Sequence, residues 1–375
     1  GGTHGRGLMR GPGRTLIACV LVAIFLVTGC VGSDAGKTEK TPRPSCHIIF
    51  DAGSSGTRLY VYEKTSAGWI KHRGPGSTAL ADPVRSIRGK TPNDTAAVVD
   101  ELISSLEAIR QNGPPDSQGI PAWQAFDWRL ECKDKMVSVL ATAGMRLAEQ
   151  QNPAASDVLW RLVEQRFNDV LGVQVTGRSI SGDEEGLYAW IAQRELEQAD
   201  DFGIVEMGGA SFQVSFPCPD CPNARQVLIG QKAVAMYSFS YSGWGQDEAW
   251  LKFGSVPACE QGAGQKDPGW QTADCSGGFS SLNVLATQVR EDMQLANIGR
   301  WYKGGAFQYS KDDDIERFCR QGVTSAYQPE TACFRAVYQR YVLDTLGFDA
   351  PVAITDADWT LGAVICTATH CLEKN

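Results

Sequence analysis

The sequence lacks three features, and each absence argues against one class of protein. Lys and Arg together number 35 against 43 Asp and Glu, so a net charge of −8 leaves no basic surplus to hold a nucleic-acid backbone. The apolar run from Leu16 to Val27 is too short to span a bilayer comfortably. One Cys-x-x-Cys pair, Cys218 with Cys221, has neither a second such pair nor paired histidines to complete a zinc site. We therefore expect no nucleic-acid partner, and zinc is the weaker explanation of the cysteines.

The residues that are present describe an ordinary globular protein. Apolar residues make up 43% of the chain and charged residues 21%. A length of 375 residues is sufficient for two domains of common size. An active site between two lobes is therefore available to this chain.

The N-terminal residues are expected to form an export signal. Arg10 and Arg14 precede the apolar run, which ends in Leu-Val-Thr-Gly-Cys at Cys30. This ending resembles the lipobox of bacterial lipoproteins, in which the signal is cut before the Cys and that Cys carries lipid. We therefore expect a signal peptide over 1–30, lipidation of Cys30, a flexible tether over 31–45 and anchoring to the cell envelope by lipid alone. A plain secretory signal or an uncleaved anchor is the alternative.

The cysteine count also favours export. Of 12 cysteines, Cys19 lies in the signal and Cys30 at the lipobox, and the remaining even number predicts up to about five disulfides in an oxidising compartment. Spacing does not establish their connectivity. Local pairings are open for Cys259 with Cys275, Cys319 with Cys333, Cys366 with Cys371, and Cys218 with Cys221.

One pattern occurs twice: an apolar strand, a carboxylate, a turn rich in Gly and Ser, and a second strand, at 48–62 and again at 204–214. Asp51 of the first copy aligns with Glu206 of the second. Hairpins of this kind expose backbone N–H groups at their tips, and two facing tips with a carboxylate at each base would hold a phosphate and a hard cation. We infer an internal duplication with a phosphate site between its halves.

The remaining segments alternate between helix and strand signals, which predicts an α/β fold. The expected elements are helix 95–110, strand 136–141, helix 156–171 capped by Ser156, strand 173–176, the hairpin 203–216 and helix 334–346. Residues 217–333 are Cys- and Gly-rich, and we expect them to be irregular and dominated by loops. The predicted division is a first lobe of 46–180, completed by 352–375, and a second lobe of 181–351 that contains a Cys-rich insertion.

Small polar residues at the turns are the candidate phosphate ligands, because phosphate oxygens can approach them closely. They are Ser54, Ser55, Gly56 and Thr57 of the first tip, Thr142 after strand 136–141, and Gly208, Gly209 and Ala210 of the second tip. Asp51 and Glu206 are the candidate ligands of Mg²⁺ or Ca²⁺. For Arg146 two interpretations stay open, a phosphate partner and a solvated or core-supporting cation.

Hydrolysis also requires a base and an oriented water. Glu185 lies at a turn near other acids, where partial burial would raise its proton affinity toward that of a general base. Ser211 and Gln213 share one face of their strand and are suited to hold the water. The alternatives are that Asp183 and Glu184 merely complement the helix dipole, and that Ser211 and Gln213 lie on a surface edge strand.

Five segments resemble, in order, the five apyrase conserved regions of the nucleoside triphosphate diphosphohydrolases. They are Asp51–Arg58, Ala141–Arg146, Gly182–Trp190, Met207–Gln213 and Trp359–Ala363. The resemblance implies two ribonuclease-H-like lobes of the actin and sugar-kinase superfamily, with the nucleotide bound between them. It also implies roles for individual residues: Glu185 as catalytic base, Ser211 and Gln213 as positioners of the water, Asp51 in the metal sphere, and Ser54, Ser55, Gly56 and Thr142 at the phosphates.

One residue departs from the family pattern, since Glu206 stands where the family usually has Asp. Its extra methylene alters the reach of the carboxylate and leaves the metal preference open. The residues that stack on the nucleobase are not identified by the resemblance. Tyr302, Phe307, Tyr309 and Trp359 are aromatic candidates, but core packing is expected for each.

The expected function is that of an exported, divalent-metal-dependent apyrase, which removes the terminal phosphate of nucleoside tri- and diphosphates and leaves the monophosphate. A nucleotide is the expected partner, and a monomer is the expected state. Two alternatives are an exopolyphosphatase-like phosphohydrolase and a nucleotide-binding surface lipoprotein with little catalysis.

Overall fold

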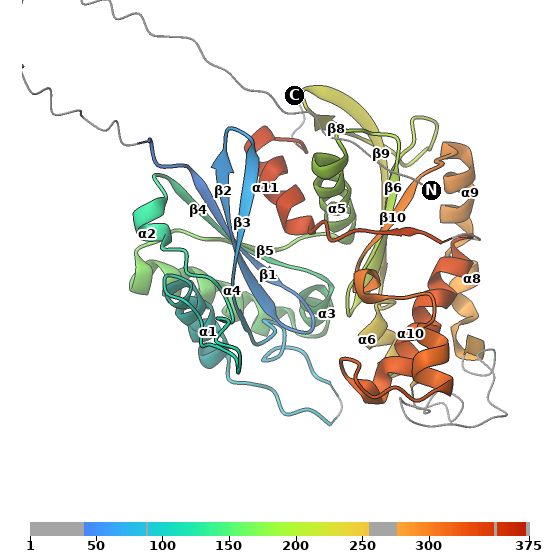
Figure 1. Cartoon of the computed structure of the whole chain (residues 1–375), viewed down its shortest axis with the longest axis horizontal. Helices are drawn as coiled ribbons and strands as arrows, with labels where there is room; N and C mark the ends of the chain where they lie inside the picture. Colours follow the sequence, from blue (N-terminus) through green and yellow to red (C-terminus); the bar gives the residue numbers. More distant parts are fainter. Residues whose placement is uncertain (1–40, 88, 255–275, 349–350, 373–375) are drawn as a thin grey trace, which may run out of the picture. The chain divides into compact units, whose positions relative to one another are not determined.

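A computed structural model describes residues 41–87, 89–254, 276–348 and 351–372. Two mixed β-sheets carry the fold (Figure 1). The first contains β1 Cys46–Ala52, β2 Thr57–Thr65, β3 Gly68–Ser77, β4 Lys135–Ala141 and β5 Thr176–Ser179, and the second contains β6 Gly203–Met207, β7 Ser211–Pro217, β8 Arg225–Ile229, β9 Lys232–Ser242, β10 Trp301–Gly305 and β11 Ala353–Ile354. The predicted signal peptide, Cys30, most of the tether, Cys259 and Cys275 lie outside the described residues.

Helices connect and cover these strands. They are α1 Thr95–Ala108, α2 Trp128–Glu131, α3 Ala143–Gln151, α4 Pro153–Arg166, α5 Gly182–Glu197, α6 Gln246–Phe253, α8 Ser281–Leu285, α9 Thr287–Ala296, α10 Pro329–Thr345 and α11 Trp359–Thr369, with short 3₁₀ or π turns at Phe167–Leu171, Gly277–Phe279, Ala306–Tyr309 and Ile315–Arg320. Among the residues described, none of these helices has the length and apolar content needed to cross a membrane.

The two sheets repeat one topology. The strand order of the first sheet is β3-β2-β1-β4-β5. When the second sheet is followed from its β8 edge, its order is β8-β9-β7-β6-β10-β11, so the same arrangement recurs with β8 added beyond β9. In each sheet a β-hairpin (β1/β2 or β6/β7) is antiparallel, and the next two strands (β4 and β5, or β10 and β11) continue in parallel. The duplication inferred from the two hairpins therefore extends over both sheets.

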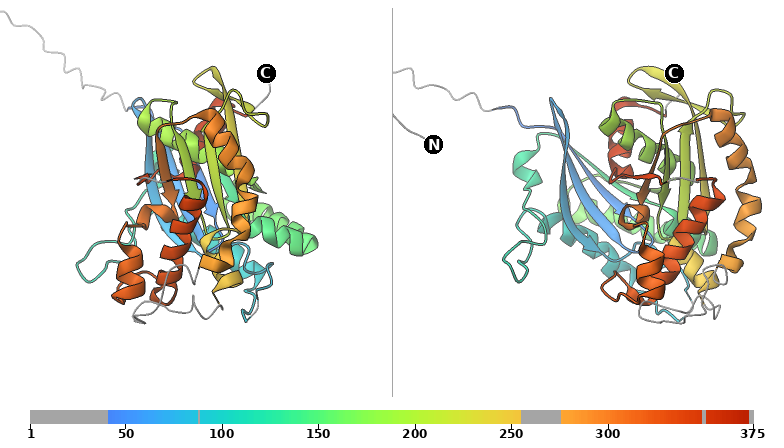
Figure 2. Two further views of the ribbon diagram at one scale, coloured as in Figure 1. Left: turned by 90° about the vertical axis from the view of Figure 1, so that its right-hand side faces the viewer. Right: turned by 45° about the vertical axis from the view of Figure 1, so that its right-hand side comes forward.

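Helices α5 and α11 follow the last strand of each repeat and pack against each other between the two sheets (Figures 1 and 2). A Cβ added to Gly362 of α11 would lie 1.8 Å from the carbonyl oxygen of Tyr188 on α5, so the helices cross at a distance that glycine alone allows. The C-terminal apolar segment also reaches the first sheet, since the hydroxyls of Tyr62 and Thr360 are 2.7 Å apart.

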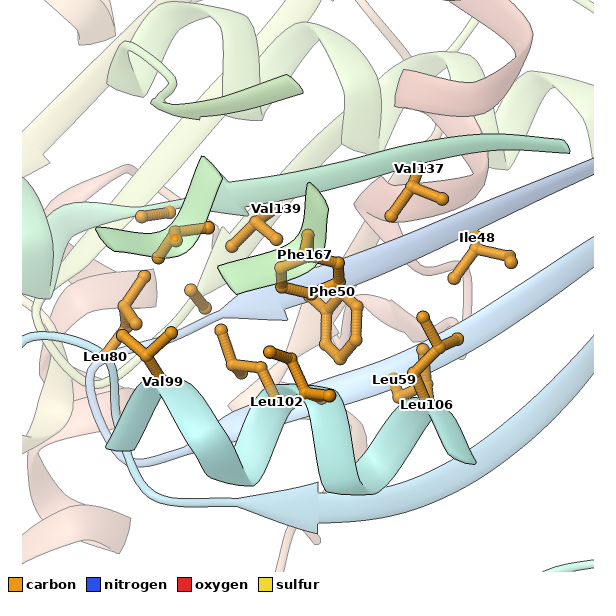
Figure 3. Packing of buried hydrophobic residues seen from close by; sticks show 14 of the residues in the cluster. Ile48, Phe50, Leu59, Leu80, Val99, Leu102, Leu106, Val137, Val139 and Phe167 are labelled. Carbon is orange, nitrogen blue, oxygen red and sulfur yellow. The ribbon is translucent and has the colours of Figure 1, made fainter. Parts of the chain in front are cut away.

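Alternation along the strands determines which side chains face the middle layer, which is formed by α5 and α11 between the two sheets. Ile48 and Phe50 point from β1 into a core formed with α1 and α4, which Figure 3 shows from close by. Ile49, between them, packs toward α5 and α11. The same alternation places Val205 in the outer core of the second sheet and Ile204 in the middle layer. Asp51 lies two residues after Ile49, and Glu206 lies two residues after Ile204. Both carboxylates therefore lie on the face of their strand that points toward α5 and α11.

The structure corrects several sequence-based expectations. Residues 217–333 contribute β8, β9 and β10 to the second sheet, so the expectation of a loop-dominated segment is wrong. Helix α4 begins earlier than predicted, because the Asn152 side chain accepts from the amide of Ala155 and Pro153 follows as the first helical residue. Ser156 therefore lies inside the helix, where its hydroxyl donates to the carbonyl of Asn152 at 2.9 Å. The strand expected at 173–176 instead begins at Thr176.

Four disulfides are formed within the described residues. Three of them, Cys218–Cys221, Cys319–Cys333 and Cys366–Cys371, are local pairings left open by the spacing. Because Cys218 and Cys221 are bonded to each other, the zinc alternative is wrong for this pair. The fourth disulfide, Cys46–Cys132, joins β1 to the residue after α2 across 86 positions.

Candidate active site

The two hairpin tips meet at Ser54. A Cβ added to Gly209 of the second tip would lie 2.3 Å from Ser54 Oγ, and one added to Gly144 at the start of α3 would lie 2.8 Å from Ser54 Cα. Three backbone segments thus converge on one serine, and Gly144 is required because an added Cβ there would meet backbone. The facing tips predicted from the duplication are brought together.

Residues of the first tip differ in what they can offer a ligand. Ser54 is half-buried at the meeting point, whereas Ser55 is exposed and its hydroxyl accepts from Arg58 at 3.4 Å. Thr57 is buried and its hydroxyl already donates to the carbonyl of Thr78 at 3.2 Å. Gly56 closes the turn by accepting from the amide of Gly53 at 3.0 Å. Ser54 is the predicted phosphate ligand of this tip with the most favourable position.

Thr142 lies beside this tip. It is the N-cap residue of α3, is 7% exposed, and makes no side-chain capping bond in that helix. Its amide donates to the carbonyl of Ala52 at 3.3 Å, which ties the start of α3 to the end of β1. The hydroxyl of Thr142 therefore remains a candidate phosphate ligand.

The second tip is supported by a helix that the sequence did not link to the site. The amide of Gly208 is used within the hairpin, where it donates to the carbonyl of Ser211 at 2.9 Å. The carbonyl of Gly209 accepts from the amides of Asp247 and Glu248 in the first turn of α6, at 2.9 and 3.0 Å. A phosphate could therefore use the amides of Gly209 and Ala210, but not that of Gly208.

Beneath the tips, the buried carboxyl groups of Asp51 and Glu206 feel the nearby charges of Glu185 and Asp358. Burial raises the pKa of Asp51 to about 7, against the opposing effect of Arg58, whose Nη1 lies 3.2 Å from Asp51 Oδ2. Burial also raises the pKa of Glu206, and the nearby charges of Glu185, Asp51 and Asp358 raise it further. Asp358 was not identified from the sequence; it caps α11, where it accepts from the amide of Thr360 at 2.9 Å.

Glu206 is 7% exposed, and its Oε2 has no hydrogen-bond partner among the residues that the structure describes. Within the same part of the chain, no group of three or more His, Cys, Asp or Glu side chains is arranged to hold a metal ion. A cation at this point would thus have at most two carboxylates, from Asp51 and Glu206, and would need further oxygen ligands from outside the protein.

Glu185 is linked to Ser211 through Arg146. The guanidinium of Arg146 lies 3.2 Å from Glu185 Oε2, donates to Ser211 Oγ at 3.3 Å and donates to the carbonyl of Ile180 at 2.9 Å. Burial raises the pKa of Glu185, while Arg146 opposes that rise. Arg146 thus connects the predicted base to Ser211 and to the carbonyl of Ile180.

Gln213 is 1% exposed on β7, which lies between β6 and β9, so the surface edge-strand alternative is wrong. Its Nε2 donates to Ser211 Oγ at 2.6 Å and to Ser240 Oγ at 2.9 Å. Its Oε1 is buried and receives no hydrogen bond from any described residue. Gln213 thus presents a lone acceptor beside Ser211, which is itself tied to the predicted base through Arg146.

The neighbouring acids and aromatics take more ordinary positions. Glu184 pairs with Arg178 at 3.0 Å, as expected of a residue at a helix start. Phe307 and Trp359 are buried and Tyr302 packs on Phe202, which confirms core packing for these three. Tyr309 is 74% exposed, so core packing is wrong for that residue.

Comparison with known proteins agrees with the resemblance. Residues 130–276 match the model of the GDA1/CD39 (nucleoside phosphatase) family. Ectonucleoside triphosphate diphosphohydrolase 3 of Mus musculus is 27% identical over 385 residues, covering 89% of this chain and 65% of that protein. Probable apyrase 4 of Arabidopsis thaliana is 29% identical over 250 residues, covering 62% of this chain and 46% of that protein. The chain thus spans less than two thirds of the length of these relatives. The resemblance to nucleoside triphosphate diphosphohydrolases is confirmed.

Solved structures show the same fold at low sequence identity. A Ppx/GppA family member of Aquifex aeolicus superimposes with a TM-score of 0.54 at 14% identity, covering 87% of this chain and 98% of that one. An exopolyphosphatase of Cytophaga hutchinsonii gives 0.53 at 10% identity, covering 87% and 99%. These likenesses concern the fold alone, and with the two repeated sheets they confirm the predicted two-lobed α/β architecture.

Proposed function

We propose that this chain is a divalent-metal-dependent phosphohydrolase that removes the terminal phosphate of nucleoside tri- and diphosphates to leave the monophosphate. The observation that carries the proposal is the group formed by Glu185, Arg146, Ser211 and Gln213 at the meeting point of two glycine-rich tips. It combines a predicted base, a hydrogen-bonded link from that base to a strand, and an acceptor to which no described residue donates. These are the components that an attacking water requires.

The attacking water must be oriented before it loses its proton. The lone Oε1 of Gln213 accepts one O–H of the water, and the carboxylate of Glu185 accepts the other. Glu185 then takes that proton as the oxygen bonds to phosphorus and the terminal phosphate leaves the nucleotide. Burial raises the pKa of Glu185, which makes it a better proton acceptor, and Arg146 keeps the group ionised before the reaction.

The phosphate chain is proposed to bind between the two tips. Ser54 and Thr142 supply hydroxyls from one side, Gly209 and Ala210 supply amides from the other, and small residues at Ser55 and Gly56 allow close approach. Because Ser54 already lies against Gly209, the tips must separate to admit a phosphate and then close on it. Such closure would exclude bulk water from the reacting group.

The residues present fit a divalent cation. Glu206 Oε2 is a buried carboxylate oxygen without a partner among the described residues, and Asp51 lies close enough for its charge to raise the pKa of Glu206. Two carboxylates supplemented by water and substrate phosphate oxygens form the usual environment of Mg²⁺, and Ca²⁺ accepts the same donors. When bound, the cation would neutralise charge on the phosphates. Asp51 and Glu206 are the residues proposed to hold it.

Phosphate release from ATP, ADP and AMP tests the proposal, with Mg²⁺, with Ca²⁺ and with a chelator. We expect release from ATP and ADP but not from AMP, and none in chelator. Glu185→Gln is expected to lower turnover by about 10²–10⁴-fold. Glu184→Gln is the matched control, because Glu184 lies in the same helical turn but pairs with Arg178. Equal activity in the Glu185→Gln protein would reject the proposed base.

A second candidate function is hydrolysis of polyphosphate, because the Cytophaga hutchinsonii exopolyphosphatase shares the fold. The same assay with polyphosphate separates the two functions. Consumption of polyphosphate while ATP and ADP both persist would reject the apyrase proposal.

Export and lipidation at Cys30 are proposed separately. They are supported by the lipobox-like ending and by four disulfides in the described residues, which form in oxidising compartments. Metabolic labelling with a radioactive fatty acid is expected to label the full chain and not its Cys30→Ser variant. Equal labelling of both would reject this site.

A further inference from the structure

We infer that Ser240 is a positioning residue for the water that Gln213 binds. The inference rests on the proposed hydrolytic function. Ser240 lies on β9, directly opposite Gln213 of β7 in the antiparallel pairing. Its hydroxyl oxygen accepts from Gln213 Nε2 at 2.9 Å, on the same face as Ser211. No sequence motif pointed to Ser240, because its role depends on a strand pairing between residues 27 positions apart.

The two serines hold one end of the Gln213 amide in this structure. A glutamine amide has two N–H donors on nitrogen and two acceptor sites on oxygen. Ser211 and Ser240 occupy the nitrogen end, at 2.6 and 2.9 Å. The oxygen end is therefore left as the acceptor, and Oε1 receives no hydrogen bond from any described residue.

The orientation of this amide decides what the water meets. A turn of the amide by 180° exchanges nitrogen and oxygen at little steric cost. An N–H group would then stand where the water needs an acceptor, and the water could not direct its lone pair at phosphorus while donating to both Gln213 and Glu185. Loss of the Ser240 hydroxyl removes one of the two hydrogen bonds that hold the amide in the orientation seen in this structure.

Ser240 also lies under the helix that carries the base. A Cβ added to Gly182, the first residue of α5, would lie 2.2 Å from Ser240 Oγ. Glu185 follows three residues later on the same helix. The start of α5, which carries Glu185, and Ser240, which holds the amide of Gln213, are therefore in contact. This contact keeps Glu185 and Gln213, the two proposed acceptors of the water, at a fixed separation.

Ser238 provides a matched control on the same strand and face. It is half-buried, as Ser240 is, and its hydroxyl also lies under α5, within 2.6 Å of Ser215 Oγ and 2.9 Å of the carbonyl of Asp183. Unlike Ser240, Ser238 makes no hydrogen bond to Gln213 in the described structure. Ser238→Ala thus removes a comparable hydroxyl without touching the amide.

The experiment measures kcat and KM for phosphate release from ATP in the full chain and in Ser240→Ala, Ser238→Ala, Gln213→Ala and the double variant Ser240→Ala/Gln213→Ala. We expect Ser240→Ala to lower kcat by about tenfold, the worth of one hydrogen bond, with KM little changed. Ser238→Ala is expected to stay within about twofold of the unchanged chain. Ser240→Ala is expected to add no further loss once Gln213 is Ala, because the two residues act as a unit.

Four outcomes would overturn the inference: an unchanged kcat in Ser240→Ala, a rise in KM alone, an equal loss in Ser238→Ala, or additive losses in the double variant. Thermal unfolding of each variant shows whether a loss of kcat comes from loss of folded protein. A loss of kcat in Ser240→Ala that is explained by unfolding would also reject the positioning role. If polyphosphate is the substrate, the same comparison is made on it, because the inference concerns the water. A chain that hydrolyses neither substrate rejects the proposed function and this inference together, whereas hydrolysis with additive losses rejects this inference alone.

Discussion

The two hairpins have the same backbone arrangement but different electrostatics. In the first, Asp51 stands opposite Arg58 across the strands, and in the second, Glu206 stands opposite Gln213. Arg58 places a positive charge 3.2 Å from its carboxylate. Gln213 directs its amide nitrogen to two serines instead, so both Glu206 Oε2 and Gln213 Oε1 are left without partners among the described residues.

This difference indicates where ligands are needed. A buried acceptor without a partner costs about 1–3 kcal/mol, and a water or cation that binds it recovers that cost. In the first hairpin, Arg58 already pairs with the carboxylate of Asp51. The second has two unsatisfied oxygen atoms close to Glu185. One difference, Arg58 in one copy and Gln213 in the other, therefore separates a hairpin whose carboxylate is paired from a hairpin whose buried oxygen atoms have no partner among the described residues.

The largest effect is expected when the amide of the second hairpin is removed. Gln213→Met keeps the side-chain volume but removes the acceptor for the water. Turnover of ATP is expected to fall by about 10²–10³-fold, which is typical of losing one group that is arranged for the transition state. Phosphate release measures the loss, and titration with a fluorescent nucleotide shows whether binding persists. A turnover near that of the unchanged chain would mean that the amide does not serve the reaction.

A pH-dependent difference in stability is expected at the start of the two hairpins. His47 of β1 is 6% exposed, and burial lowers its pKa from 6.5 to about 4. Phe202 occupies the matching position before the second hairpin and does not titrate. Because the unfolded chain binds a proton on His47 below pH 6.5 while the folded chain does not, stability is full above pH 6.5. It falls by about 3 kcal/mol as the pH drops to about 4.

Unfolding curves collected between pH 7.5 and pH 4 test this prediction. His47→Gln keeps a hydrogen-bonding partner for Ser138, which lies 2.9 Å from His47 Nε2. As the pH falls, the His47→Gln variant should lose less stability than the unsubstituted chain. Phe202→Leu is the control and should differ from the unchanged chain by a constant amount. Parallel curves for His47→Gln would contradict the assigned pKa shift.

A smaller effect is expected at the carboxylates. Glu206→Gln removes a charge that Asp51, Glu185 and Asp358 all oppose, so stability in chelator is expected to rise by about 2 kcal/mol. The rise in melting temperature on adding Mg²⁺ or Ca²⁺ should shrink, because a proposed ligand is lost. Asp51→Asn, the same change in the first hairpin, should give a smaller gain in chelator because Arg58 already neutralises Asp51. A larger gain in stability from Asp51→Asn than from Glu206→Gln would mean that the first hairpin, not the second, carries the less well compensated carboxylate.

Part of this site could be predicted from local sequence signals. The two hairpins and the placement of Glu185, Ser211 and Gln213 rest on turn residues and strand alternation, which act over a few positions. Asn152 followed by Pro153 is also a local start signal for α4, and it outweighs Ser156 as the cap.

Long-range pairing explains what the sequence did not reveal. Strand β10 carries two glycines and joins β6 only after about a hundred intervening residues, so its segment resembles a loop until the sheet is seen. Cys46 and Cys132 likewise meet only because β1 and β4 are neighbours. Asp358 and Asp247 resemble ordinary acids at helix starts, and only their position beside the tips distinguishes them.

The smallest effect is expected at Arg58, which is the counterpart of Gln213. Its side chain is 46% exposed, so its ion pair with Asp51 is screened by solvent, and Arg58→Met should cost less than about 1 kcal/mol of stability. The substitution leaves Asp51 as unpaired as Glu206, so the increase in melting temperature on adding a divalent cation should grow. Turnover should fall far less than in Gln213→Met. If Arg58→Met instead loses more turnover than Gln213→Met, then Arg58 contacts the phosphate directly, and the first tip takes part in the chemistry as fully as the second.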